Sequence, residues 1–418
     1  MSQVTKVMLI AALTTAPLAA SSVSAAAEPR GSRWDGAWAT AVQRPFKNDW
    51  SPAWADEGFN RQSVRQVVRI GAGGSRLRIR LSNAYGAAPL HLTGASVART
   101  GEGAAVLPGT IRSLTFRSSA AATIPVGEQL VSDPIALPVR PRERLTVTLY
   151  FQGATGPSTF HALAMEMSYR AGGDHLRDPG AGAFTESTAS WYYLDGVEVT
   201  GRPGGRKRAV VAFGDSITDG YGSTAGADAR YPDALAERLM AQGRARPVLN
   251  AGIAGNKVLN DSTCLGEKAT ARFQRDALDQ PRVRTVIVLE GINDILHSET
   301  PPSPCTVPNP RVTAQELIAG YRKLIRTAHA SKVRIVGATL PPFKGAYGYT
   351  ERGEEVREAV NKWIRSSREY DAVVDFDRAL ADPADLDRIR PALDSGDHLH
   401  PNDAGYRIMA AAVDLDSL

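Results

Sequence analysis

Cysteine is scarce in this sequence: Cys264 and Cys305 are the only two among 418 residues. In an exported protein, a single pair is typical of a disulfide and argues against a metal or redox site. The predicted bridge would close a loop of 41 residues (305 − 264). Both cysteines lie in stretches rich in glycine, proline and serine, so we expect the bridge to tie two loops together.

Long apolar runs are also missing. Beyond the N-terminal region no run reaches eighteen apolar residues, which excludes a transmembrane helix there. Residues 1–25 have the features of a secretory signal peptide: Lys6 gives a positive start, 7–20 are mostly apolar, and Val23-Ser24-Ala25 fits a cleavage site. Cleavage one or two residues later, within 25–27, fits as well. We therefore expect a soluble, secreted protein with no stable membrane insertion.

No charge of one sign dominates the chain. The formal net charge is +5, and it falls to +4 when Lys6 leaves with the signal peptide (5 − 1). Basic residues are scattered, with the densest cluster at Arg206-Lys207-Arg208, and they are not interleaved with aromatic residues. This pattern argues against a nucleic-acid partner. The length and the ordinary globular composition indicate two or three domains.

Residues 33–200 lack any long stretch with helical periodicity. Leu77–Leu81 and Leu145–Leu149 alternate strictly between apolar and polar residues, as half-buried strands do. Glycine, proline and asparagine turns separate further short strand-like segments at 64–70, 90–97, 111–116 and 129–137. The pattern predicts an all-β domain, a sandwich or jelly roll. Its aromatic residues suit either core packing or glycan binding, namely Trp34, Trp38, Trp50, Trp54 and Tyr85.

After a glycine-rich linker at 201–205, strands and helices alternate from 206 to 418. Apolar runs expected to form strands lie at 209–213, 247–249, 285–289, 333–338 and 373–376. Helical patterns lie at 231–242, 313–330, 354–370 and 402–413. This alternation predicts a three-layer α/β domain with a parallel sheet. In such sheets, ligands bind at the carboxyl ends of the strands.

Four polar segments fall at these strand ends or open the last helix. They are Gly214-Asp215-Ser216, Asn250–Asn256, Glu290–Asp294 and Asp397–Pro401. A serine hydroxyl is a weak nucleophile, and a histidine held by a carboxylate is its usual base. Asp397 and His400 are three residues apart, which allows the carboxylate to reach Nδ1 and leaves Nε2 to face Ser216.

The same segments offer hydrogen-bond donors for the oxyanion of a tetrahedral intermediate. These are the backbone N–H groups of Ser216 and Gly255 and the side-chain amide of Asn293. Glycine suits position 255 because it lets the backbone approach the reacting carbonyl closely.

The four segments resemble the signature blocks of the SGNH, or GDSL, hydrolase family. The letters of that name match Ser216, Gly255, Asn293 and His400, and Asp397 matches the acid of the Asp-x-x-His block. The resemblance covers about residues 206–418. It implies a flavodoxin-like sheet of about five parallel strands, with ester hydrolysis that uses no metal or other cofactor.

The layout of an exported β-domain ahead of the hydrolase is similar to that of bacterial secreted esterases acting on plant polysaccharides or aryl esters. We therefore expect a serine esterase that cleaves short-chain esters, acetyl or aryl and feruloyl, on small molecules or polysaccharides through an acyl-enzyme. A lipase acting on longer acyl chains is the alternative within the class. The oligomeric state stays open.

Two rival functions come from other classes. One is a metal-dependent phosphoesterase, with hard ligands drawn from Asp215, Asn293, Asp397, His398 and His400. The other is a non-catalytic glycan-binding protein with an inert α/β domain. An ordinary α/β-hydrolase is excluded, because the chain has no Gly-x-Ser-x-Gly elbow.

Neighbours of the four blocks have secondary expectations. His398, Phe343 and Tyr347 are candidate substrate-pocket residues. His297 is expected on a helix face near the pocket mouth. Asp215 is expected to brace the serine turn, and Asp294 to cap the helix that begins beside it.

Overall fold

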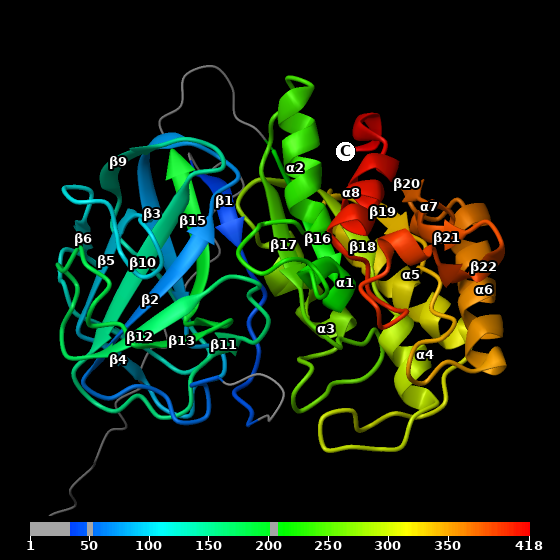
Figure 1. The fold of residues 1–418 in the computed structure, drawn as a ribbon, viewed down its shortest axis with the longest axis horizontal. Coiled ribbons are helices and arrows are strands. Elements are labelled where there is room, and N and C mark those ends of the chain that lie inside the picture. The colour runs from blue at the N-terminus through cyan, green and yellow to red at the C-terminus, as the bar shows by residue number, and fades with distance from the viewer. Residues whose placement is uncertain (1–33, 48–52, 201–207) are drawn as a thin grey trace, which may run out of the picture.

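The computed structural model describes residues 34–47, 53–200 and 208–418, which form a β-rich part and an α/β part side by side (Figure 1). The predicted signal peptide, the linker at 201–205 and Trp50 lie outside these ranges. Within them, no helix has both the length and the apolar character needed to cross a membrane.

The β-rich part contains two larger antiparallel sheets. The first has the order β1-β15-β3-β8, with β9 also paired to β3, and comprises β1 (Asp35–Ala39), β3 (Gly74–Ser82), β8 (Gln129–Val131), β9 (Ile135–Val139) and β15 (Leu194–Thr200). The second has the order β13-β12-β2-β10-β5-β6 and comprises β2 (Gln62–Arg69), β5 (Gly94–Arg99), β6 (Arg112–Leu114), β10 (Arg144–Phe151), β12 (Ser168–Gly172) and β13 (Glu186–Thr188). Two small pairs complete it: β4 (Leu90–Leu92) with β7 (Ala122–Ile124), and β11 (Phe160–His161) with β14 (Trp191–Tyr192).

Both sheets contribute to one core, as expected for a sandwich. The alternating apolar residues of β3 and β10 are fully buried in the same cluster: Leu77, Ile79, Leu81, Leu145, Val147 and Leu149. Trp38 and Trp54 are also buried there, and the Trp38 ring packs edge-on against Trp191 at 4.8 Å. These two tryptophans therefore pack in the core and do not present an exposed glycan platform.

Two of the predicted β segments are each divided in the structure. Segment 90–97 becomes β4 and β5, because the first half pairs with β7 and the second half joins β10. Segment 129–137 becomes β8 and β9, with Pro134 between them; proline has no N–H to continue a ladder.

The α/β part is built on a parallel sheet of order β17-β16-β18-β19-β20, which confirms the predicted fold class. Its strands are β16 (Ala209–Gly214), β17 (Val248–Gly252), β18 (Val283–Leu289), β19 (Arg334–Ala338) and β20 (Ala372–Val374). Every residue of β16 is buried, as expected for a strand covered on both faces.

Helices cover both faces of this sheet (Figure 1). α2 packs against α8, while α5 packs against α3 and α6. The helices are α1 (Ser216–Asp219), α2 (Tyr231–Ala241), α3 (Ala269–Phe273), α4 (Ile292–Ser298), α5 (Ala314–Ala330), α6 (Glu351–Ser366), α7 (Phe376–Leu380) and α8 (Asp403–Ala412). Shorter elements are η1 (Gln274–Leu278), η2 (Pro391–Leu393), η3 (Leu415–Ser417) and the hairpin of β21 (Ala381–Asp382) with β22 (Asp385–Ile389).

The predicted strand at 373–376 is too long at its carboxyl end. Strand β20 stops at Val374, because the Asp375 side chain accepts a hydrogen bond from the Arg378 N–H and starts helix α7. A side-chain cap of this kind competes with continued extension of the strand.

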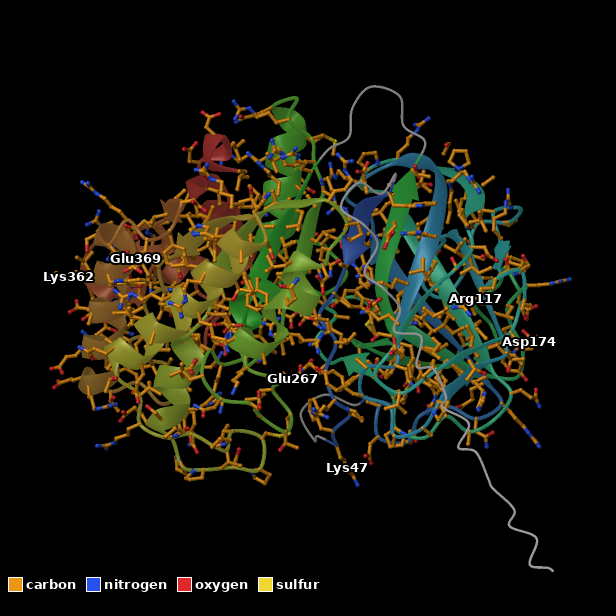
Figure 2. All side chains as sticks on the ribbon, turned by 180° about the vertical axis from the view of Figure 1, so that it is seen from behind. Lys47, Arg117, Asp174, Glu267, Lys362 and Glu369 are labelled. Atoms are coloured by element: carbon orange, nitrogen blue, oxygen red, sulfur yellow. A yellow bond between two sulfur atoms is a disulfide. The ribbon has the colours of Figure 1, made fainter. Side chains whose placement is uncertain are left out.

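Polar contacts join the β-rich part to the α/β part. The Gln43 side chain donates to the Cys264 carbonyl at 3.0 Å, and Arg80 donates to the Gln280 side chain at 3.0 Å. Glu267, labelled near the junction in Figure 2, accepts from Arg44 at 3.4 Å. The two parts therefore pack as one body in this structure.

The predicted disulfide between Cys264 and Cys305 is present, with Cα atoms 4.9 Å apart. It links the loop that follows β17 to the loop that follows α4. Replacing both cysteines with serine should lower the free energy of unfolding by about 4 kcal/mol, because a 41-residue loop is then released in the unfolded chain. Urea unfolding of the oxidised protein and the double variant measures this difference.

Reductant supplies the control for this prediction. Dithiothreitol should lower the unfolding midpoint of the wild-type protein and leave that of the double variant unchanged. Equal midpoints for the oxidised protein and the variant would contradict a stabilising role.

Candidate active site

Ser216 lies at the carboxyl end of β16, as the first residue of α1. Asp215 is the N-cap of this short helix, and its side chain accepts a hydrogen bond from the Ile217 N–H at 3.0 Å. A Cβ atom at Gly214 would lie 2.3 Å from the Leu289 carbonyl oxygen, so the turn needs glycine there. The expected bracing of the serine turn by Asp215 is thus present in the geometry.

The structure brings Ser216, His400 and Asp397 into one hydrogen-bonded chain. Ser216 Oγ lies 2.8 Å from His400 Nε2, and His400 Nδ1 lies 2.6 Å from Asp397 Oδ2. The other carboxylate oxygen of Asp397 accepts from the backbone N–H groups of Leu399 (3.0 Å) and His400 (2.9 Å). With Nδ1 donating to the carboxylate, Nε2 is free to accept the serine proton.

The Asp397 carboxyl is held in its charged form. Burial raises the pKa of Asp397. The hydrogen bond and charge of His400 and the two backbone N–H groups lower this pKa by more, so the net pKa is well below its ordinary value. An ionised carboxylate at this position stabilises an imidazolium on His400.

Gly255 and Asn293 lie at the ends of the two strands that flank β16. Gly255 follows β17 and has φ of +75°, a conformation that favours glycine. Asn293 is in the first turn of α4 after β18 and is 4% exposed. Its side-chain amide donates one hydrogen bond to the Asn256 carbonyl at 3.1 Å, and an amide has a second N–H. All four predicted blocks therefore meet at one edge of the sheet.

Asp294 does not cap the helix in which it lies, contrary to our expectation. The N-cap of α4 is Gly291, and Asp294 lies within the first turn. Its carboxylate instead accepts from the backbone N–H groups of Val258 at 2.7 Å and Leu259 at 3.0 Å. Burial raises the pKa of Asp294 to about 6. This side chain positions the loop that follows Gly255.

Sequence reasoning missed Arg272, which no motif marks. This fully buried side chain donates to the carbonyls of Gly214 and Ala251, each at 2.8 Å, and to Glu290 at 3.0 Å. It therefore ties together the carboxyl ends of three adjacent strands, β17, β16 and β18. Burial raises the pKa of Asp215 and that of Glu290, and the charge of Arg272 offsets part of each increase. The net pKa of Asp215 is about 7, and that of Glu290 lies above its ordinary value.

Tyr221 was also missed, although it directly follows the serine block. Its ring centroid is 4.4 Å from that of His400, and the residue is 44% exposed. Tyr221 therefore forms part of the surface beside the triad.

The predicted pocket residues fall in different surroundings. His398 is half-buried, and its Nδ1 lies 2.6 Å from Asp394 Oδ2; His400, not His398, contacts Ser216. Tyr347 is 77% exposed. Phe343 is fully buried in the core, where it packs against Tyr349, so it does not line an open surface.

His297 lies on α4 and is partly buried. Burial, with a smaller contribution from the charge of Lys257, lowers its pKa to about 4. We therefore expect a neutral imidazole at this position near neutral pH.

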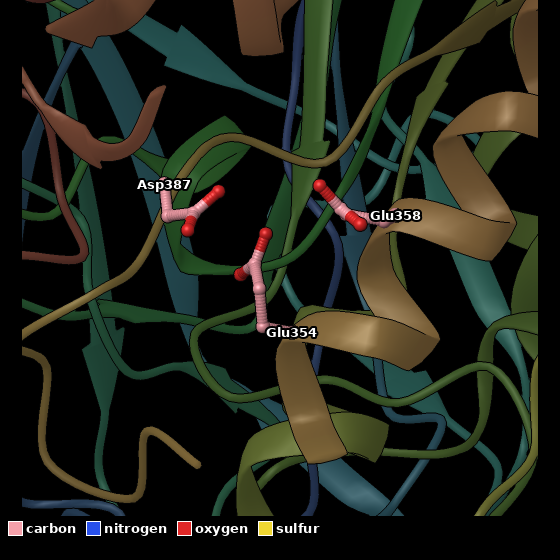
Figure 3. A group of neighbouring side chains, drawn as sticks. All are labelled: Glu354, Glu358 and Asp387. Atoms are coloured by element: carbon pink, nitrogen blue, oxygen red, sulfur yellow. The ribbon is translucent and has the colours of Figure 1, made fainter. Parts of the chain in front are cut away.

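Among the described residues, one group of three or more acidic, histidine or cysteine side chains has the spacing to hold a metal ion. It consists of Glu354, Glu358 and Asp387, on α6 and β22 (Figure 3). Glu354 forms an ion pair with Arg357, which compensates its charge. None of the ligands considered for a phosphoesterase belongs to this group.

A parallel sheet in an α/β domain thus holds a hydrogen-bonded serine–histidine–aspartate chain at its carboxyl edge, an arrangement that can serve nucleophilic catalysis. Residues 212–408 match the model of the GDSL-like lipase/acylhydrolase family, so this stretch carries the pattern of a GDSL-like acylhydrolase domain. The resemblance drawn from the sequence is thus confirmed. No curated protein matches the chain.

Several solved structures are similar to the chain. An acetylxylan esterase, Axe2, from Geobacillus stearothermophilus is 24% identical, with 50% of this chain and 93% of that chain covered and a TM-score of 0.38. A GDSL-like lipase from Bacteroides thetaiotaomicron is 17% identical, with 49% and 84% covered and a TM-score of 0.34. The acetyl xylan esterase AlAXEase is 21% identical, with 49% and 96% covered and a TM-score of 0.37. The family assignment rests on the match over residues 212–408.

Proposed function

We propose that the protein is a secreted serine esterase that hydrolyses short-chain carboxylic esters through an acyl-enzyme. The observation that supports this most directly is the hydrogen-bonded chain from Ser216 through His400 to Asp397. The proposed secretion rests on the signal-like N-terminal sequence and agrees with a disulfide, which persists in oxidising compartments. We also propose the division into a β-domain at 33–200 and a hydrolase domain at 206–418.

In the proposed reaction, Ser216 Oγ attacks the ester carbonyl carbon while His400 Nε2 takes the hydroxyl proton. The carbonyl oxygen becomes an oxyanion held by the N–H groups of Ser216 and Gly255 and the amide of Asn293. His400 then gives its proton to the departing alcohol. Water enters and repeats the same steps to release the acid and restore Ser216.

The surface beside the triad favours esters carried on a sugar or another ring. Tyr221 is 44% exposed, and its ring contacts that of His400. An exposed aromatic face next to the catalytic base can stack on a ring while the ester reaches Ser216. Acetylated polysaccharides and aryl esters both fit this chemistry.

Hydrolysis of p-nitrophenyl acetate, butyrate and palmitate in the presence of EDTA tests the proposal. We expect rapid cleavage of the two short esters and slow cleavage of the palmitate. Preference for palmitate would favour the lipase alternative. Failure to cleave any ester, together with metal-dependent cleavage of bis(p-nitrophenyl) phosphate, would contradict the esterase assignment. Release of acetate from acetylated xylan then tests the polysaccharide substrate.

A further inference from the structure

A buried histidine of the β-rich part reaches the helix that begins with Ser216. His161, at the end of β11, is 1% exposed. Strand β11 lies on the side of the β-rich part that faces the α/β part (Figure 1). Its Nε2 is 3.0 Å from Oδ1 of Asp219, the last residue of α1. The contact joins residues 58 positions apart in the chain, from different parts of the molecule.

The hydrogen-bond partners of His161 require a proton on both of its ring nitrogens. Nδ1 lies 2.8 Å from the Ala41 carbonyl oxygen, and Nε2 lies 3.0 Å from both the Leu163 carbonyl oxygen and Asp219. All three partners are acceptors, so both nitrogens donate, as only the imidazolium can. Burial lowers the pKa of His161. The charge and hydrogen bond of Asp219 and the two carbonyls raise this pKa by more, so it lies above its ordinary value.

The orientation of the imidazole is held by its neighbours in the β-rich part. Its ring stacks on Trp191 with centroids 5.4 Å apart. The Trp191 indole N–H in turn donates to the Val67 carbonyl at 2.9 Å, which fixes the stacking partner. His161 is therefore a rigid donor aimed at Asp219.

Asp219 also contacts the loop that carries Gly255. Its second carboxylate oxygen accepts from the Ala254 N–H at 3.1 Å, and Ala254 directly precedes Gly255. One carboxylate thus connects the helix of the nucleophile, the loop of an oxyanion donor and the histidine of the β-rich part. The contact between His161 and Asp219 is buried, because both side chains are nearly inaccessible to solvent.

We propose that His161 is a positioning residue for the esterase site, through which the β-domain sets the Ser216 turn and the Gly255 loop at catalytic distance. The β-domain then takes part in catalysis without touching substrate. This inference rests on the proposed function of the α/β domain. Displacement of a catalytic group by about 1 Å lowers the rate as much as 10²-fold, so loss of the contact should be visible in kcat.

The variant His161→Gln tests this role, because glutamine keeps one N–H donor and removes the charge and the second donor. We expect kcat for p-nitrophenyl acetate to fall roughly 10- to 100-fold, with KM within about twofold of the wild-type value. Asp219→Asn, which removes the charge from the other partner, should give a loss of similar size. A kcat within twofold of wild type in both folded variants would overturn the proposal.

A matched control removes a different contact between the two parts. Arg69 of β2 pairs with Glu237 of α2 at 2.7 Å and with Asp228 at 3.7 Å, and has no contact with α1 or the Gly255 loop among those described. Arg69→Gln should keep kcat within twofold, whatever it does to the unfolding temperature. A loss in Arg69→Gln equal to that in His161→Gln would assign the effect to general loosening and overturn the positioning role.

Nitrogen-15 spectra of histidine-labelled wild-type protein provide a readout that needs neither a variant nor activity. A buried imidazole with two protonated nitrogens at pH 7.5 is expected for His161, and a neutral ring there would overturn the proposal. If the wild-type protein cleaves no ester, the proposed function fails by itself. The spectra then still decide whether the charged contact between His161 and Asp219 exists.

Discussion

Replacing Ser216 with alanine should lower kcat for p-nitrophenyl acetate by roughly 10⁴-fold or more, with a far smaller change in KM. The reason is that Oγ, 2.8 Å from His400 Nε2, is the proposed nucleophile, and alanine offers no atom to form the acyl-enzyme. Ser216 is 6% exposed and its side chain is small, so the variant should fold normally. Steady-state kinetics with a circular dichroism spectrum measure both points.

His400→Ala should cause a loss of similar size, because serine and base act as one unit. For the same reason, the double variant Ser216→Ala/His400→Ala should be no slower than either single variant. Strictly additive losses would show that the two side chains act in separate steps, against the proposed roles.

The histidine two residues away provides the discriminating comparison. His398 pairs with Asp394 and does not contact Ser216 in this structure. His398→Ala should therefore reduce kcat less than tenfold. A loss in His398→Ala as large as that in His400→Ala would mean that the base has been assigned to the wrong histidine.

The meeting of the four blocks could be predicted from the sequence for a physical reason. The apolar runs and the alternation with helices indicate parallel strands, and parallel strands place their carboxyl ends at one edge. Ser216, Gly255 and Asn293 each follow such a strand, so the sheet brings them together whatever the loops do. Local pattern and global fold agree here, which is why the four blocks lie together in the structure as the strand order predicts.

The supporting residues could not be predicted in this way. Arg272 binds carbonyls at the ends of separate strands, and His161 reaches Asp219 from another part of the molecule. Such contacts depend on the final packing, and neither a period nor a motif in the sequence marks them. Asp294 shows the same limit, because its position beside a helix start predicts a cap while its side chain reaches a neighbouring loop.

Some strands of the β-rich part are too short to be predicted from the alternation of apolar and polar residues. Strands β11 and β14 have two residues each, too few for an alternating pattern to be recognised. They nevertheless matter, because β11 places His161 and β14 places Trp191 beside it.

Asn293→Ala should lower kcat by roughly 10²–10³-fold, the usual cost of removing one oxyanion donor. The amide donates to the Asn256 carbonyl at 3.1 Å, which fixes its rotamer and directs its second N–H elsewhere. Because the oxyanion exists only in the transition state and the intermediate, KM should change little. Kinetics with p-nitrophenyl acetate measure the split between kcat and KM.

Asn293→Asp separates the oxyanion role from support of the Asn256 loop. A carboxylate has nearly the shape of the amide, but it is an acceptor only and carries the same charge sign as the oxyanion. If the amide stabilises the oxyanion, aspartate should be at least as damaging as alanine, even where the unfolding temperature is unchanged. A loss below tenfold in Asn293→Ala would remove this side chain from the catalytic site. The N–H groups of Ser216 and Gly255 would then hold the oxyanion without it.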